Sequence, residues 1–270
     1  MNATALAILS ISAYLLSALL IARQLYLFAK GEIKTEKRSP LYLAWFAILA
    51  HFSYIAIEFQ RHHGFSFSFF STASLVAMIV ALLLLIATLN KPVEKLGIVL
   101  FPITALMLAL DLTFSEKPHP LHTHNWEMTT HILTSIIAFS LLNIAALQAI
   151  LLAFQNQQLK SHPPKRFVQS LPPLETMESL LFQMLAAGVF FLTISLLTGF
   201  IFVKDLFAQH LVHKTVLSIV AWFIFSGLLL GRLRYGWRGI TAIKWTLLGF
   251  LSLLLAYFGS KMVLEIILHR

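Results

Sequence analysis

The chain has 270 residues, of which 59% are hydrophobic and 11% are charged, and its mean hydropathy is +0.83. Because a soluble domain carries about 25% charged residues, this composition excludes a soluble domain with one anchor and indicates an integral membrane protein. The net charge of +9 does not indicate a nucleic-acid partner, because most of the excess cations lie in short loops between apolar segments. The absence of cysteine excludes disulfides, iron–sulfur clusters and thiol-linked cofactors within the chain.

The apolar runs predict an all-α, polytopic membrane helix bundle with eight transmembrane helices, which we interpret as one integral membrane domain over residues 1–270. A span needs about 20 apolar residues, and no period-2 alternation predicts a strand. The first run is too long for a cleaved signal peptide and is interpreted as a span. The predicted spans are Ala3–Phe28, Leu41–Phe59, Phe69–Leu89, Leu96–Leu112, Glu127–Phe154, Glu175–Val203, His213–Arg232 and Ile240–Ile267.

Lys and Arg concentrate in the first, third, fifth and seventh loops between these runs. The positive-inside rule therefore predicts that these loops are cytoplasmic and that both termini lie outside. All histidines except His162 then fall in outer loops, at outer helix ends or within the membrane. Because imidazole is the commonest metal ligand and titrates near neutral pH, this distribution predicts a haem, metal or proton site that faces the outer side.

His51 is the candidate inside the bilayer. At 3.6 residues per turn it shares one helix stripe with Ala44, Ala47, Tyr54 and Glu58. Small residues on such a stripe indicate a face turned toward the bundle interior, and ionisable residues within a membrane are candidates for function. One interpretation makes His51 a metal ligand or proton relay. The other is a neutral histidine that hydrogen-bonds a backbone carbonyl or Tyr54.

His131 lies about one turn inside the outer end of the fifth predicted helix and shares a stripe with Ser135 and Ala138. Glu127 precedes it at i−4, within reach of the imidazole. A carboxylate beside a ligating histidine orients the ring and raises its basicity, which favours a ligand role for His131. The alternative is an ion pair that only anchors the helix entry.

The remaining histidines give weaker signals. A loop tract with His119, His122 and His124 resembles a metal-binding segment by composition, although loops also tolerate such runs without a function. His210 and His213 stand three residues apart before the seventh helix, where they either face an anion such as a haem propionate or form a solvated helix start. The penultimate residue, His269, is expected to fray with the terminus.

Together with His131, four segments occur in an order and spacing that resemble a known family. They are Lys214–Trp222, Gly231-Arg232, Gly236-Trp237-Arg238-Gly239 and Ala256-Tyr257-Phe258-Gly259. The pattern is similar to that of the cytochrome c assembly family of haem-handling membrane proteins (the CcsA/CcmC group), and within it to the YpjD subgroup of bacterial inner-membrane proteins. The resemblance covers residues 127–267, which we interpret as a cytochrome c assembly-like core.

The resemblance implies that His131 ligates haem iron at the outer face. It also implies a second outer histidine near the end of the last helix, a place that His269 approaches. Two features depart from the family pattern. The stretch before Lys214 contains no tryptophan where the family has a tryptophan-rich haem-binding segment, and Leu230 falls where the family has an intramembrane histidine. His51 is then the candidate for a deeper ligand.

The first hypothesis is therefore a haem-binding protein of the bacterial inner (plasma) membrane, linked to cytochrome c or respiratory complex assembly. Its predicted ligands are His131 with His213 or His269, and His51 as a deeper ligand; His131 and His51 are the predicted metal ligands. Such a protein holds haem without a bond-making step, so we do not expect an enzyme. Its expected partners are the lipid bilayer, haem and other membrane assembly proteins. The alternatives are a proton- or cation-coupled transporter or accessory subunit that uses His51 and Glu58, and a scaffold whose outer loops contact partner subunits.

Overall fold

The structure is a computed structural model, and it describes residues 3–32, 38–62, 69–114, 126–160, 173–202 and 212–259. Within these ranges it is helical, without a strand. Eight of its helices are long and apolar enough to cross a membrane, which confirms the predicted number of spans. The chain divides into two compact units, Met1–His122 with Gln158–Pro172, and Thr123–Gln157 with Pro173–Arg270.

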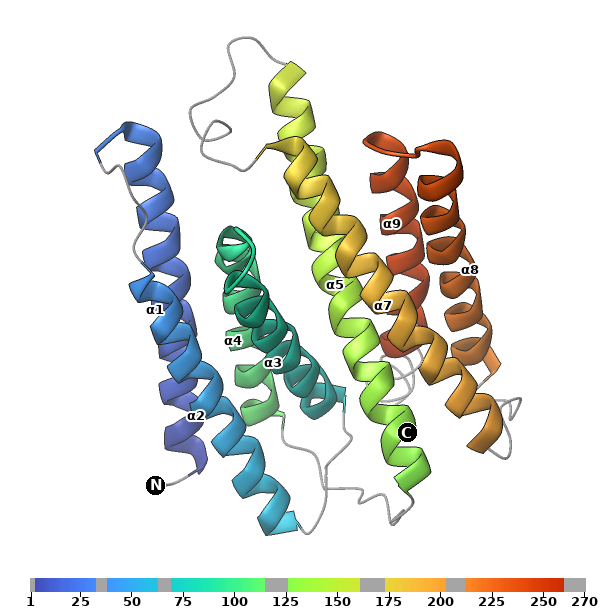
Figure 1. Ribbon diagram of the computed structural model, residues 1–270. Helices are drawn as coiled ribbons and strands as arrows, with labels where there is room; N and C mark the ends of the chain where they lie inside the picture. The colour runs from blue at the N-terminus through green and yellow to red at the C-terminus, as the bar shows by residue number, and fades with distance from the viewer. Residues whose placement is uncertain are drawn as a thin grey trace. The chain divides into compact units, whose positions relative to one another are not determined.

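Unit 1 contains four membrane-spanning helices and a short 3₁₀ turn (Figure 1). Helix α1 packs against both α2 and α4, while α3 packs against α4 and α2. Ala44 and Ala47 are fully buried, so the backbones of α1 and α2 approach closely. At this contact the Ser10 hydroxyl donates a hydrogen bond to the carbonyl of Ala47, with 2.8 Å between the oxygens. The elements are α1 (Ala3–Lys30), α2 (Ser39–His62), α3 (Phe69–Thr88), η1 (Glu94–Leu96) and α4 (Gly97–Thr113).

Unit 2 contains the other four spans, and α5 contacts two of them. The Phe139 ring on α5 stacks on Tyr257 and lies against Phe250, with centroids 4.6 and 6.0 Å away. On α7, Gly188 lies so close to the Leu142 side chain of α5 that a Cβ at that glycine would be 2.7 Å from it. Helix α8 packs on α7 and on α9. The elements are α5 (Trp126–Lys160), α7 (Leu174–Phe202), α8 (Val212–Tyr235), α9 (Ile240–Leu254) and the π-helical segment η2 (Leu255–Gly259).

The predicted helix bounds differ most from the structure at the ends of the fifth and the last helix. The fifth helix extends to Lys160, beyond the predicted end at Phe154, because its polar last turns leave the apolar run but continue the helix. The last α-helix ends at Leu254 and changes to π-type hydrogen bonding over Leu255–Gly259, whereas the sequence predicted one helix to Ile267. The residues after Gly259 lie outside the described part of the chain.

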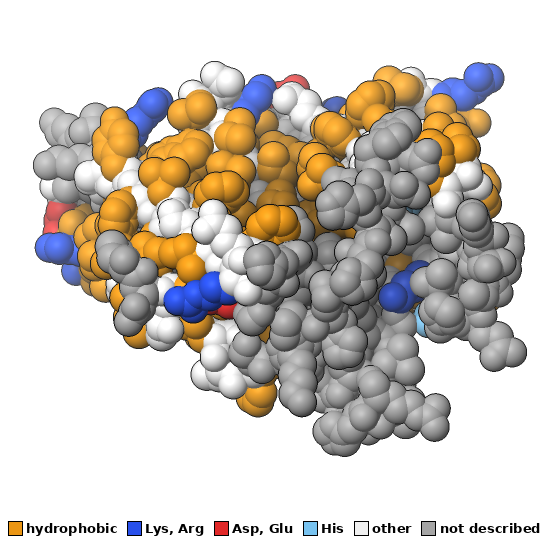
Figure 2. Space-filling model, turned by 90° about the horizontal axis from the view of Figure 1, so that it is seen from below, with side chains coloured by type: hydrophobic (Ala, Val, Ile, Leu, Met, Phe, Trp, Pro, Cys, Tyr) orange, Lys and Arg blue, Asp and Glu red, His pale blue; other side chains and the backbone are white. Residues whose placement is uncertain are grey.

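Large apolar side chains cover much of the described surface. Leu19, Phe52, Ile201 and Leu233 are each more exposed than buried, and Figure 2 shows many hydrophobic side chains at the surface of the described part of the chain. A soluble protein rarely exposes contiguous apolar patches of this kind. These side chains therefore face lipid, and the chain is a multi-pass membrane protein.

Candidate functional site

His131 is held by a backbone carbonyl of the neighbouring helix. Its Nδ1 lies 2.9 Å from the carbonyl oxygen of Ser195 on α7. Because a carbonyl oxygen only accepts, the proton of the neutral ring must be on Nδ1, and the lone pair is then on Nε2. The Thr198 hydroxyl lies 3.4 Å from the same Nδ1 and donates its own proton to carbonyls of α7. Contacts with α7 therefore determine both the orientation of the His131 ring and the nitrogen that carries its proton.

The helix contact around His131 is close and polar. Gly199 leaves the space that the ring occupies, since a Cβ at that position would lie 3.0 Å from the imidazole Cε1. One turn further along α5, the Ser135 hydroxyl oxygen lies 2.5 Å from that of Ser195 and 2.6 Å from the carbonyl of His131. These contacts fix the register of α5 against α7 at the level of the imidazole.

The other ring nitrogen of His131 is open. Nε2 forms no hydrogen bond with any residue that the structure describes, and the side chain is only partly buried. A metal-binding histidine typically donates one ring N–H to a carbonyl or carboxylate and presents the other nitrogen to the metal. His131 has this arrangement, with the Ser195 carbonyl in the place that the sequence assigned to Glu127. The Glu127 side chain lies outside the described residues.

The other predicted ligands are placed as follows. His213 is exposed at the start of α8, which is the same end of unit 2 as His131, because α5 begins, α7 ends and α8 begins there (Figure 1). His51 belongs to unit 1. No cluster of three or more His, Asp or Glu in the described ranges is arranged to hold a metal ion. Outside the described residues lie His269, His210 and the loop histidines His119, His122 and His124.

His51 is sealed within unit 1. Its side chain is fully buried, its Nε2 hydrogen-bonds the Ser74 hydroxyl of α3 over 3.1 Å, and its ring meets the edge of Tyr14 with centroids 6.1 Å apart. Its Nδ1 has no hydrogen-bond partner among the described residues. Four residues of the predicted inward-facing stripe, Ala44, Ala47, His51 and Tyr54, are buried, while Glu58 is only partly buried.

A buried carboxylate joins three helices of unit 1. Asp111 on α4 accepts a hydrogen bond from the Ser71 hydroxyl of α3 over 2.7 Å. The Tyr54 hydroxyl of α2 donates to its other oxygen over 3.4 Å. The sequence does not reveal the partners of Asp111, because both donors lie on other helices. The one sequence feature that could have indicated Tyr54 as a partner is its position on the inward-facing stripe of His51.

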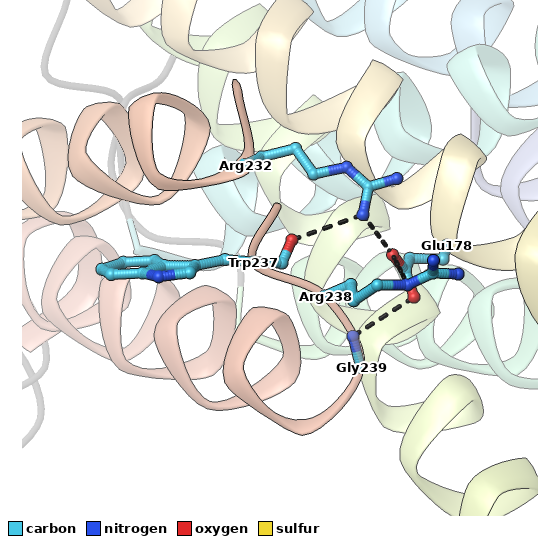
Figure 3. Close-up of polar contacts among 5 residues, drawn as sticks. All are labelled: Glu178, Arg232, Trp237, Arg238 and Gly239. Atoms are coloured by element: carbon cyan, nitrogen blue, oxygen red, sulfur yellow. Dashed lines mark hydrogen bonds and ion pairs between the residues drawn. The ribbon is translucent and has the colours of Figure 1, made fainter. Parts of the chain in front are cut away.

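At the other end of unit 2, the GWRG segment surrounds a buried carboxylate of α7 (Figure 3). The Arg232 guanidinium donates to Glu178 Oε1 over 2.6 Å, and the Arg238 Nε lies 3.5 Å from the same oxygen. The backbone N–H of Gly239 donates to Oε2 over 3.2 Å. From the sequence alone, Glu178 stands in the first turns of its own helix, where a carboxylate meets the positive end of the dipole. Its partners lie elsewhere, in the last turn of α8 (Arg232) and in the α8–α9 connection (Arg238 and Gly239).

The same connection requires glycine. Gly236 and Gly239 have φ angles of 66° and 59°, a region that residues with a Cβ rarely adopt. Gly231 lies directly beneath the Trp237 ring, so that any Cβ there would overlap the indole. Trp237 in turn stacks on Trp245 of α9, with centroids 6.0 Å apart. The conspicuous sequence motif Gly231–Gly239 therefore builds a tight turn that holds α7, α8 and α9 together.

Comparisons with known proteins agree with this organisation. A family model described as Cytochrome C assembly protein matches residues 37–268, a range that begins well before the predicted core at 127. The inner membrane protein YpjD of Escherichia coli strain K12 is 35% identical over 76% of this chain and 77% of its own length. An uncharacterised 28.8 kDa protein of Azospirillum brasilense is 29% identical over 77% of both chains.

A more distant relative carries a more specific description. The cytochrome c biogenesis protein CcsA of Chlamydomonas reinhardtii is 28% identical over 64% of this chain and 50% of its own length. No solved structure matches the chain.

Proposed function

The chain belongs to the cytochrome c assembly protein family, and from this membership we propose that it binds haem at the predicted outer face of the bacterial inner membrane. The observation that carries the proposal is the state of His131, whose Nδ1 is committed to the Ser195 carbonyl. That bond leaves the lone pair of Nε2 available for an iron ion. A haem-related membrane role fits this family, and two of the relatives are named cytochrome c biogenesis protein CcsA.

The residues around His131 fit a haem ligand on physical grounds. An axial histidine has to keep its ring plane and tautomer while it binds iron, and here a main-chain carbonyl fixes both. Because Ser195 acts through its backbone, this contact survives most side-chain changes in α7. The side chain is partly exposed, and Nε2 has no hydrogen-bond partner among the described residues. Imidazole is the usual proximal ligand of haem iron.

We propose that the chain's own residues bind and orient haem and catalyse no reaction. A bound haem would supply an iron ion that an imidazole nitrogen can ligate. His131 would provide that nitrogen, while Ser195 and Thr198 hold the ring and Gly199 leaves the space beside it free. His213 is the partner ligand that the described residues favour, because it is an exposed imidazole at the same end of unit 2. His51 and His269 stay predictions.

The expected role of such binding is to hold haem for cytochrome c or respiratory complex assembly, together with other membrane assembly proteins. The support for this finer role is the family membership and the similarity to a relative named as a cytochrome c biogenesis protein. A holding role requires reversible ligation. Ligation by His131 at a partly exposed site is compatible with transfer of the haem to a partner.

The test is a spectrum of the full-length protein purified from haem-replete cells. We expect a Soret band from the unchanged protein and a loss of most of it in His131→Gly, because the ligand is removed. Exogenous imidazole should restore the band in His131→Gly, since the small ring occupies the vacated space. A misfolded variant would not respond to imidazole, so this rescue separates ligation from structural damage.

The matched control is His162→Gly, which removes a histidine on the predicted cytoplasmic side. Its spectrum should equal that of the unchanged protein. A colourless unchanged protein that takes up no added haem would refute the proposal, as would a His131→Gly spectrum identical to the control.

Transport of protons or cations through unit 1 stays the alternative prediction. The observation in its favour is two buried polar pairs within unit 1, His51 with Ser74 and Tyr54 with Asp111. A proteoliposome flux assay separates the two functions. Transport predicts a pH- or cation-dependent flux that His51→Ala removes, whereas haem binding alone predicts no flux in either protein.

A further inference from the structure

A pocket of about 330 Å³ lies within unit 1, at the end where α1 and α3 finish and α2 and α4 begin. It is separate from the His131 site, which belongs to unit 2. Cationic side chains line it from two different connections: Arg38 comes from the start of α2, and Lys91 and Lys95 come from the turn between α3 and α4. Glu94 is the one carboxylate among the lining residues.

The pocket has the chemistry of an anion site. Gln24 and Asn90 add side-chain amides to its wall, and an amide NH₂ is a hydrogen-bond donor. The wall also includes the start of α2, a helix of 24 residues that begins at Ser39, and the positive end of its dipole favours an anion. Among the described lining residues, three cations stand against one carboxylate, a balance that favours an anion.

The position of the pocket specifies the anion further. The lining residues stand at the ends of the spans Ala3–Phe28, Ser39–Arg61, Phe70–Thr88 and Glu94–Thr113, on the side that the charge pattern predicts to be cytoplasmic. Ile21 and Leu25 give the pocket a buried apolar wall beneath the cations. Basic pockets between spans on the cytoplasmic side bind anionic lipid headgroups. A phosphate group attached to an apolar chain matches both the cationic and the apolar part of the pocket wall.

We propose that this pocket binds a phosphate group, carried either by an anionic phospholipid or by a soluble phosphate compound from the cytoplasm. Arg38 and Lys91 provide the charge, since they line the same pocket from two different connections. Occupation would tie the α1–α2 connection to the α3–α4 turn. Phosphate binding should therefore stabilise unit 1.

The experiment titrates the full-length protein in neutral detergent and follows its thermal unfolding midpoint. The probes are short-chain phosphatidylglycerol, phosphatidylcholine of the same chain length, glycerol 3-phosphate and inorganic phosphate, all at equal ionic strength. We expect phosphatidylglycerol to raise the midpoint more than phosphatidylcholine. A basic residue near an anionic surface contributes about 1 kcal/mol. Each of Arg38→Gln and Lys91→Gln should therefore weaken binding about fivefold, since about 1.4 kcal/mol is tenfold.

Arg23→Gln is the matched control, since Arg23 is an exposed cation of the same end of α1 and does not line the pocket. It should leave the affinity unchanged, and the midpoints of all variants without ligand should match, because Arg23 and Arg38 are exposed and Lys91 is only partly buried. If glycerol 3-phosphate or inorganic phosphate competes with phosphatidylglycerol, the source is a soluble phosphate compound; if only the lipid binds, the source is the membrane.

Either of these results supports the site. Equal effects of phosphatidylglycerol and phosphatidylcholine would overturn the proposal. Equal losses in Arg23→Gln and Lys91→Gln would also overturn it, because a general surface potential would then explain the binding.

Discussion

Arg232 of α8 and Glu178 of α7 are joined by a hydrogen-bonded ion pair of 2.6 Å between Nη1 and Oε1. The Glu178 side chain is only 8% exposed, while Arg232 is 33% exposed. The Arg232 guanidinium also lies over the Phe182 ring, 4.7 Å from its centroid. Glu178 therefore carries a buried negative charge at the contact between α7 and α8, and Arg232 is the cation that stabilises this charge.

Arg232→Ala should destabilise the protein strongly. It leaves the buried carboxylate with the more distant Arg238 and the Gly239 N–H. Removal of one partner of a buried pair costs about 3–5 kcal/mol, and we expect the lower end because Arg238 remains. The measurement is the free energy of unfolding in mixed micelles. Arg234→Ala, an exposed change in the same helix turn, is the control and should have little effect.

Addition of Glu178→Gln to Arg232→Ala should recover part of the lost stability, because the uncompensated charge is then gone. If the double variant is less stable than Arg232→Ala alone, the carboxylate is stabilised by its other partners and the ion pair is not the main contact.

Gly231→Ala and Gly227→Ala form a matched pair on α8. A Cβ at Gly231 would overlap the Trp237 ring, whereas a Cβ at Gly227 meets nothing within 4 Å. Gly231→Ala should lower the free energy of unfolding by about 1–3 kcal/mol, the usual cost of overpacking. Gly227→Ala should be neutral or stabilise by up to about 1 kcal/mol, since alanine favours helix over glycine. If both variants change the free energy of unfolding equally, the Trp237 ring can move away from the new Cβ without loss of stability.

The spans themselves could be predicted from the sequence, because hydrophobic length is a local property and the membrane imposes helical structure on apolar runs. The His131 site could be predicted in part. Its position near an outer helix end was readable, but its hydrogen-bond acceptor is a main-chain carbonyl 64 residues away. A carbonyl belongs to every residue, so the sequence holds no signal that marks Ser195.

The ion-pair cluster could not be predicted for a different reason. Glu178 was read as a helix-start residue because its nearest sequence neighbours gave that signal. Its actual partners, Arg232 and Arg238, lie 54 residues away or more, and their loop had been explained by the positive-inside rule alone. A second role for the same cations becomes visible only when α7 and α8 are packed together.

Gly199→Ala should weaken haem binding although the proposed ligand, His131, is still present. The new Cβ would lie 3.0 Å from Cε1 and 3.3 Å from Nδ1 of His131, so the ring has to shift and its bond to the Ser195 carbonyl lengthens. Changes to the groups that orient a ligating histidine typically cost 10–100-fold in metal affinity, and we expect about tenfold. The measurement is a haem titration followed at the Soret band.

Gly188→Ala is the control for that titration. It lies on the same helix and meets Leu142 of α5 instead of the imidazole. It should lower stability through packing, yet the folded fraction should keep its haem affinity. If both variants lose the same affinity, the effect comes from the α5–α7 contact as a whole and the orientation of His131 is not what matters.

Asp111→Ala should destabilise unit 1 more than Asp111→Asn. Alanine removes the acceptor of the Ser71 and Tyr54 hydroxyls within the bundle, whereas asparagine keeps one oxygen that accepts. A buried donor left without its acceptor costs about 1–3 kcal/mol. We therefore expect Asp111→Ala to lower the free energy of unfolding by that amount for at least one of the Ser71 and Tyr54 hydroxyls.

The measurement for Asp111 is thermal and denaturant unfolding in neutral detergent, with Thr113→Ala as the control. Thr113 is an exposed residue of the same helix, and its hydroxyl donates only to carbonyls of α4. If Tyr54→Phe combined with Asp111→Ala is no more stable than Asp111→Ala alone, the stranded donor is not Tyr54. The cost then arises from Ser71, which has the shorter bond of 2.7 Å. A stability of Asp111→Ala equal to that of Thr113→Ala would show that the carboxylate does not hold α2, α3 and α4 together.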